Sequence, residues 1–202
     1  TERLYREEGL ALRRKRRRKG ASGVRVESPV AQRPNEKWAM DFVHDSTADG
    51  RRFRALVVMD KYTRECPAIE VDWSIGGKRV VSVLDRLTEL RPLPETITTD
   101  NGPEFSGKAL DKWACRTGVN LHFIGPGKPM ENAYGESLIG KLRDECLSGN
   151  WFLSMTDARE IIEAWRRDYN SAKQHSSLGG LTPQEFVETS AGLQLALVSP
   201  AG

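Results

Sequence analysis

Three carboxylates in the sequence stand where they could do chemistry. Asp41 lies inside the apolar run "KWAMDFVHD", where an acidic side chain is unfavourable unless it is paired or binds a cation. Asp100 ends the β-branched run "TITTD", directly before the turn signal Asn-Gly-Pro. Glu136 follows Asp100 with 35 residues between them. Carboxylates that face one point raise one another's pKa unless a divalent cation neutralises them, so the set predicts a metal site.

The chemistry expected of such a site is phosphoryl transfer. Carboxylate oxygens with open water positions suit Mg²⁺ or Mn²⁺, and two such ions about 3.5–4 Å apart serve in-line displacement at phosphorus. No nucleophilic side chain is evident. The histidines, His44, His122 and His175, show no ligand spacing, which favours a surface or core-edge position for each. Taken alone, the stretch around Asp100 favours an ordinary turn-capping residue over a catalytic carboxylate.

Hydrophobic patterning predicts the elements that position these carboxylates. Alternating runs predict three strands joined by short turns, at 37–45, 52–60 and 64–72, with Asp49-Gly50 as a hairpin signal. Two further strands are expected at 95–100 and 119–124. The apolar spacing predicts helices at 76–91, at 107–118 (ended by Gly118), at roughly 131–148, at 156–170 (with Thr156 as a cap), and from a Thr182–Glu185 capping box onward.

This order predicts an α/β fold with a mixed five-stranded sheet, three antiparallel strands followed by two parallel ones, and helices on both faces. Functional groups gather at the carboxyl ends of strands in such sheets. We expect the first and fourth strands to be neighbours, so Asp41 and Asp100 would lie side by side. The later helix would bring Glu136 to the same edge.

The charge of the chain is unevenly distributed. Residues 1–34 carry a net charge of +7 and the remaining 168 residues carry −4, within an overall +3. The excess is concentrated in one run of cations, Arg13, Arg14, Lys15, Arg16, Arg17, Arg18 and Lys19. These cations repel one another, so the run is expected to be exposed, and nucleic acid is its natural counter-charge. The alternative is a solvated tail.

The chain has the size and composition of one domain with appendages. It has 202 residues, of which 38% are hydrophobic and 29% charged, without a signal peptide or an apolar run of membrane-spanning length. We expect a basic N-terminal helix, arm and linker (1–34), a catalytic core (35–150), a helical extension (151–190) and a tail (191–202). Cys66, Cys115 and Cys146 are isolated, so neither a zinc site nor a disulfide framework is indicated, and a reducing cytoplasmic setting fits.

Several of these stretches resemble a known family. "WAMDFV", "TTDNGPEF" and "GKPMENAYGESLIGKLRDECL" are similar to the catalytic core of insertion-sequence transposases related to retroviral integrases. "HSSLGGLTPQEF" is typical of the branch, numbered three, in which a second reading frame encodes this core. The resemblance covers roughly residues 34–188. Asp41, Asp100 and Glu136 match the family's D…D-(35)-E pattern, and Arg143 matches its basic residue seven positions after the glutamate.

The resemblance implies an RNase H-like fold and a DDE transposase that cleaves element ends and transfers the exposed 3′-OH strand. It further implies double-stranded DNA as partner, a dimer or larger oligomer on DNA, and a bacterial, nucleoid-associated location. Family members carry helix-turn-helix domains upstream, and the first residues resemble the inside of a helix, so we expect a fragment of a longer protein.

Expected DNA contacts surround the three carboxylates. Asn132, Glu136, Gly140 and Arg143 share one helix face. Gly140 in mid-helix indicates either close approach of DNA or close helix packing. The expected contacts are Arg143, Lys141, Lys128 and Asn101, besides the basic run.

The roles of other residues near these motifs are less specific. Asp60 is expected to be a turn acceptor, whereas Glu104 would either order the loop or approach a metal. Trp38, Trp113 and Trp165 are expected in the core, and Trp151 at an interface or on DNA.

Two other functions are weighed against a transposase. A non-catalytic, DNA-binding regulatory remnant would keep the basic arm but lose a carboxylate, and here all three are present. A nuclease acting on RNA–DNA hybrids would share the fold, but the D-(35)-E spacing and "GGLTPQEF" favour the transposase.

Overall fold

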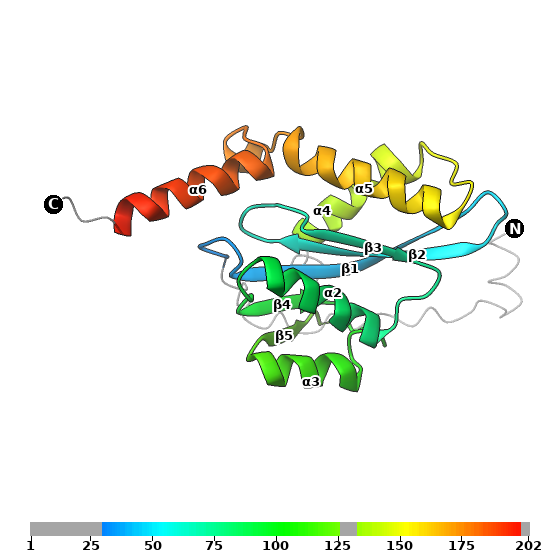
Figure 1. The fold of residues 1–202 in the computed structure, drawn as a ribbon, viewed down its shortest axis with the longest axis horizontal. Helices are drawn as coiled ribbons and strands as arrows, with labels where there is room; N and C mark the ends of the chain where they lie inside the picture. Colours follow the sequence, from blue (N-terminus) through cyan, green and yellow to red (C-terminus); the bar gives the residue numbers. More distant parts are fainter. Residues whose placement is uncertain (1–29, 126–132, 199–202) are drawn as a thin grey trace, which may run out of the picture.

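The structure is a computed structural model that describes residues 30–125 and 133–198, with side chains to residue 190. Within these residues five strands form one mixed sheet in the order β3-β2-β1-β4-β5 (Figure 1). The strands are β1 (Lys37–Ser46), β2 (Arg52–Asp60), β3 (Ala68–Asp72), β4 (Thr96–Thr99) and β5 (Asn120–Phe123). The first three pair antiparallel, and β4 pairs parallel with β1 and β5. The predicted sheet is confirmed, and the predicted helix and linker before residue 30 lie outside the described residues.

Helices cover both faces of the sheet (Figure 1). On one face lie α2 (Gly77–Leu90) and α3 (Lys108–Thr117). On the other lie α4 (Ala133–Leu142) with its continuation η2 (Arg143–Leu147), and α5 (Met155–Ser171). A short 3₁₀ turn, η3 (Ser176–Leu178), leads into α6 (Pro183–Val198).

Strand β1 separates two hydrophobic cores because its side chains alternate between the two faces. Trp38 and Met40 are fully buried in the core beneath α2 and α3. Val43 is buried in the core formed with α4, η2 and α5. Asp41 has the same parity as Val43 and therefore belongs to the α4 side of the sheet. The alternation thus sets which helix can meet the Asp41 carboxylate.

The turn after β2 explains why β3 is shorter than the predicted strand at 64–72. Asp60 is 1% exposed, and its Oδ1 accepts hydrogen bonds from the backbone N–H groups of Tyr62 (2.8 Å) and Thr63 (3.2 Å). Arg64 has φ +62°, outside the extended region. The regular pairing of β3 with β2 therefore begins at Ala68, after an Asp60 N–H to Glu65 carbonyl bond of 2.9 Å within the turn. The prediction that Asp60 is a turn acceptor is confirmed.

The helix ends follow local side-chain chemistry. Gly118 ends α3 in the left-handed conformation with φ +76°, as predicted. Thr182 and Glu185 form the predicted capping box, with reciprocal hydrogen bonds of 3.2 and 2.8 Å. The prediction of Thr156 as cap is wrong, because the Ser154 hydroxyl accepts the Asp157 N–H and α5 begins at Met155.

The remaining predictions on burial hold for the described side chains. Trp38, Trp113 and Trp165 are 0%, 2% and 8% exposed, as core residues should be. The three cysteines are free thiols. Among the described helices, none combines the length and apolarity needed to cross a membrane.

Candidate active site

The register between β1 and β4 places Asp41 and Asp100 level with each other. Lys37, Trp38 and Ala39 pair with Thr96, Ile97 and Thr98. Continuing this register by two residues brings Asp41 opposite Asp100, just beyond the last paired residues of the two strands. The expectation that the first and fourth strands are neighbours is confirmed.

Asp100 is both a turn residue and an exposed carboxylate. Its Oδ1 accepts a 2.9 Å hydrogen bond from the Gly102 backbone N–H, which closes a turn immediately after β4. A Cβ at position 102 would lie only 2.9 Å from Asp100 Oδ1 and 3.2 Å from Glu104 Oε2. Only glycine therefore leaves the Asp100 carboxylate in this position.

An ion pair ties the loop after Asp100 to the sheet. The Arg54 guanidinium on β2 donates to the Glu104 carboxylate, and both side chains are largely buried. This hydrogen bond holds the pKa of Glu104 below its ordinary value. Arg54 also stacks on Phe42, which stacks on Phe105 of the same loop. Glu104 thus orders the loop, and the expectation that it approaches a metal stays a prediction, since its Oε2 and the Asp100 Oδ1 would both lie close to a Cβ at position 102.

Helix α4 lies over β1 and brings a third carboxylate toward Asp41. Burial raises the pKa of Asp41, the 2.7 Å hydrogen bond from the Phe42 N–H lowers it, and the negative charges of Asp100 and Glu136 raise it further. The Arg143 guanidinium lowers it slightly. The charges of Asp100, Glu136 and Arg143 are thus close enough to Asp41 to act on its pKa.

The carboxylates approach one another without closing around an ion. Among the described residues, no group of three His, Cys, Asp or Glu side chains lies close enough to hold a metal. The donor chemistry nevertheless fits a hard divalent cation, because Asp41, Asp100 and Glu136 are carboxylates, and the charges of the last two add to the effect of burial in raising the pKa of Asp41.

The expected DNA contacts fall in different places. Arg143 is exposed at the start of the π-helical η2. Asn101 donates from Nδ2 to the Ile124 carbonyl at 2.9 Å, which links the turn after Asp100 to the end of β5. Lys141 lies over the Tyr169 ring, away from Glu136. Lys128, Asn132 and the basic run at 13–19 lie outside the described residues.

Gly140 is not explained by close helix packing. A Cβ built at this position would have no described atom within 4 Å apart from its own helix backbone. The expectation that a neighbouring helix requires glycine here is therefore wrong for the described residues. Close approach of DNA stays a prediction.

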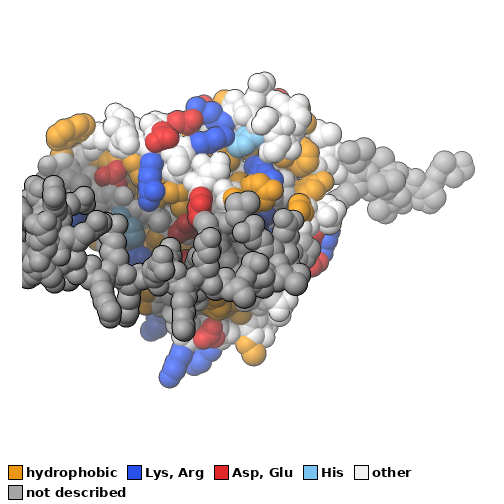
Figure 2. All heavy atoms as spheres, turned by 180° about the vertical axis from the view of Figure 1, so that it is seen from behind, with side chains coloured by type: hydrophobic (Ala, Val, Ile, Leu, Met, Phe, Trp, Pro, Cys, Tyr) orange, Lys and Arg blue, Asp and Glu red, His pale blue; other side chains and the backbone are white. Residues whose placement is uncertain are grey.

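The face opposite to the view of Figure 1 carries both signs of charge. In Figure 2, Lys and Arg side chains lie among Asp and Glu side chains on the part of this face that is coloured by side-chain type. Trp151 is 82% exposed in the connection between η2 and α5, beside Leu153 at 79%. The expectation that Trp151 contacts a partner or DNA stays a prediction.

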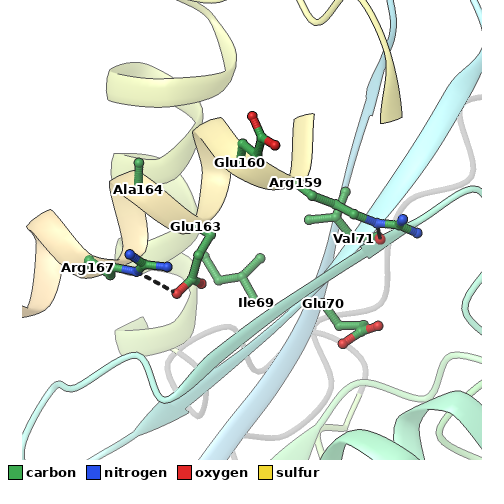
Figure 3. Close-up of a pocket in the computed structure, with 8 residues that line it drawn as sticks. All are labelled: Ile69, Glu70, Val71, Arg159, Glu160, Glu163, Ala164 and Arg167. Atoms are coloured by element: carbon green, nitrogen blue, oxygen red, sulfur yellow. Dashed lines mark hydrogen bonds and ion pairs between the residues drawn. The ribbon is translucent and has the colours of Figure 1, made fainter. Parts of the chain in front are cut away.

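A separate hollow of about 500 Å³ lies between the edge strand β3 and α5 (Figure 3). Glu70, Arg159, Glu163 and Arg167 are among the residues that line it. Arg167 pairs with Glu163 at 3.0 Å, and Arg159 donates to the Val71 carbonyl. None of the carboxylates expected to be catalytic lines this hollow, so it is distinct from the site at the end of β4.

The fold is that of retroviral integrase catalytic cores. The catalytic core domain of BIV integrase is 16% identical, with a TM-score of 0.60 over 80% of this chain and 99% of that chain. A chain of the simian T-cell lymphotropic virus intasome is 18% identical, with a TM-score of 0.66 over 76% of this chain and 54% of that chain. At these identities the likeness shows the RNase H-like fold, as predicted.

Two models of the integrase core domain match residues 31–129 and 117–183, and the chain belongs to this family. A protein of insertion element IS407 from Burkholderia multivorans is 48% identical over 91% of this chain and 66% of its own length. A protein of insertion element IS476 from Xanthomonas euvesicatoria is 44% identical over 91% of this chain and 53% of its own length. The transposase InsF for insertion sequence IS3A of Escherichia coli is 28% identical over 77% of this chain and 55% of its own length. The chain thus spans about half to two thirds of these relatives.

Sequence reasoning missed two features near the site. Nothing local in "RFRAL" pairs Arg54 with Glu104, which lies 50 residues further along the chain. Only the charge of Arg54 inside an apolar strand signals that it has a partner. The positive φ of Arg64 was also missed, because its neighbours Thr63 and Glu65 give no glycine signal.

Proposed function

We propose that this chain is the catalytic core of an insertion-sequence transposase of the DDE class. It would cleave DNA at element ends and transfer the exposed 3′-OH to a second phosphodiester. The observation that supports this best is that the strand register brings Asp41 level with Asp100, while the charges of Asp100 and of Glu136 on α4 both act on Asp41. The names of its relatives, which include transposases of insertion sequences, point the same way.

In this proposal each side chain has a defined task. Asp41, Asp100 and Glu136 would hold two Mg²⁺ or Mn²⁺ ions. When bound, such ions activate the attacking oxygen and stabilise the leaving oxygen of an in-line displacement. Arg143 would bind a backbone phosphate beside the carboxylates. Arg54 and Glu104 would keep the loop after Asp100 fixed to the sheet. A solved relative, the HTLV-2 integrase core, carries magnesium, which supports the choice of metal.

The proposed setting follows from the relatives and the charge. Double-stranded DNA would be the partner, bound by a dimer or larger assembly in the bacterial nucleoid, since two element ends must meet. The alternative is a non-catalytic DNA-binding remnant, and the intact carboxylate set speaks against it.

Joining of a labelled element-end duplex to target DNA tests the proposal. Asp100→Asn removes the charge but keeps the shape, so joining in Mg²⁺ or Mn²⁺ should fall by about 10³-fold or more. Binding of Mn²⁺ by the protein without DNA, measured by calorimetry, should weaken in the same variant. Thermal unfolding should be unchanged.

Asp111→Asn is the matched control, because Asp111 is an exposed carboxylate on α3 at a distance from the site. It should join DNA and bind Mn²⁺ like the wild type. If joining survived Asp100→Asn, the site would be wrongly assigned. If the wild-type chain bound DNA but did not bind Mn²⁺ and did not join DNA ends, the result would favour a non-catalytic DNA-binding remnant.

A further inference from the structure

Tyr169 contacts two basic side chains and the backbone of a third basic residue. The Lys141 Nζ lies 5.7 Å from the centroid of the Tyr169 ring, and the His175 ring meets the same ring edge-on at 5.2 Å. The Tyr169 hydroxyl donates to the Arg64 carbonyl at 3.1 Å. We call Arg64, Lys141 and His175 the Arg64 cluster.

The hydrogen-bonding capacity of this cluster is largely unused. Arg64 Nε and Nη1 and His175 Nε2 are buried and find no hydrogen-bond partner among the described residues. Buried polar groups normally have a hydrogen-bond partner, and a buried group without one is unfavourable. Arg64 Nη2 and Lys141 Nζ are not among these buried atoms, so they are the ones that a ligand from solvent would meet.

The acidic side chains nearby already form hydrogen bonds and ion pairs with other residues. Glu65 accepts two hydrogen bonds from Arg91, at 2.8 and 3.1 Å. Glu145 accepts from Trp165 Nε1 at 3.0 Å and pairs with Lys173 at 3.2 Å. The positive charge of Arg64 and Lys141 is therefore not neutralised by an ion pair within the described residues. Together with burial, it lowers the pKa of His175 to about 4.

The conformation of Arg64 holds its guanidinium in place. Its backbone adopts a positive φ that a non-glycine residue rarely takes, and the buried Asp60 turn enforces it. The guanidinium carbon lies 3.3 Å from the centroid of the Tyr134 ring. Because the ring covers one face and Nε and Nη1 are buried, Nη2 is the guanidinium atom that can donate a charge-assisted hydrogen bond to a phosphate oxygen.

We propose that the Arg64 cluster binds a phosphate of the DNA backbone, as a second contact separate from Arg143. Lys141 follows Glu136 by five residues, about 140° around the helix, and so faces away from the carboxylates. Tyr134 precedes Lys141 by seven residues and lies on its face. Helix α4 would thus contact DNA on two sides. The inference rests on the proposed function, because a DNA-backbone phosphate is a ligand only if this chain binds DNA.

The salt dependence of binding to a duplex oligonucleotide in metal-free buffer tests the inference. Each phosphate contact adds about 0.9 to the slope of log K against log[NaCl]. Arg64→Gln and Lys141→Gln should each make the slope less negative by about that amount and weaken binding several-fold. Arg167→Gln is the matched control, because Arg167 is an exposed cation on α5. Its ion-pair partner Glu163 would still be paired with Arg166 in this variant.

A second measurement guards against misfolding of Arg64→Gln. Lys141→Gln alters only a long side chain whose charged end is not among the buried atoms, so it should unfold at the wild-type temperature and carries the test if Arg64→Gln is destabilised. Sodium phosphate should raise the unfolding temperature of the wild type above that in NaCl of equal ionic strength, and less so in Lys141→Gln.

Equal slopes for wild type, Lys141→Gln and Arg167→Gln would overturn the inference. Phosphate stabilisation with unchanged DNA slopes would also overturn it, since the ligand would then be a free anion. Neither result bears on the proposed function, which stands or falls with metal-dependent joining in Asp100→Asn.

Discussion

At the scale of single residues, the site depends on an absent side chain as much as on those present. Gly102 donates its N–H to Asp100 and leaves room for the carboxylate that accepts it. Because the obstructed atom is the end of a side chain, an added methyl group would displace the carboxylate and leave the fold intact.

Gly102→Ala should therefore separate chemistry from stability. We expect the unfolding free energy to change by less than about 1 kcal/mol, while DNA joining falls by about tenfold or more because the Asp100 oxygen must move. Thermal unfolding and the joining assay measure the two effects. Gly107→Ala is the control, since its Cβ would come no closer than 3.4 Å to the Pro103 carbonyl. Wild-type joining by Gly102→Ala would show that the loop adapts freely.

Sequence reasoning succeeds here where a residue conflicts with its surroundings. Asp41 is conspicuous because an acidic side chain in an apolar strand needs a partner. Its position opposite Asp100 follows from the pairing of the first strand with the fourth. Glu104 remained ambiguous, because its partner Arg54 lies on another strand and no local pattern encodes their meeting. Contacts between distant segments depend on three-dimensional packing, which residue spacing alone does not specify.

At the scale of elements, α4 does the most. It carries Glu136 toward Asp41 and Lys141 toward Tyr169, and it passes into a π-helical turn at Arg143. π-helical turns are rare and are often found at functional sites. Apolar spacing predicted a helix over roughly 131–148 but could not distinguish this turn, since both helix types keep Leu142 and Cys146 buried.

Gly140→Ala tests what the exposed side of α4 meets. The substitution should stabilise the helix by about 1 kcal/mol and raise the unfolding temperature by about 2–4 °C, because it meets no described atom. If DNA passes close to the helix here, joining should nevertheless fall. Ser82→Ala, on α2 at the other face of the sheet, gives a helix-stabilising comparison that should leave joining unchanged. Unchanged joining by Gly140→Ala would mean that DNA does not approach this position.

At the scale of the whole molecule, charge and fold are carried by different parts of the chain. Residues 1–29 hold a net charge of +6, which leaves −3 on residues 30–202. The described sheet and both cores lie within the acidic part. We therefore propose residues 1–34 as a DNA-binding arm, 35–150 as the catalytic core, 151–190 as a helical extension and 191–202 as a tail. Helix α5 of the extension shares a core with the sheet.

A chain of residues 30–202 should keep its unfolding temperature to within a few degrees but lose most of its DNA affinity. The salt slope should fall by several units, since each lost phosphate contact removes about 0.9. Binding at a series of NaCl concentrations measures this. Replacing the seven cations of 13–19 by glutamine in the full chain should have a similar effect, which would assign the loss to charge. Unchanged affinity would mean that the core alone binds DNA.

The pairing of β1 with β4 also has a consequence for the order of events in folding. Strands β1 and β2 can pair across a short hairpin. Lys37 pairs with Thr96 only after the intervening 58 residues have been closed into a loop. That ladder spans only three residue pairs, and the two aspartates stand just past its end. The hairpin is thus expected to form early and the Asp41–Asp100 juxtaposition late. We expect the reverse order under mild heat or denaturant, so that the proposed DNA joining would be lost while most of the sheet is still intact.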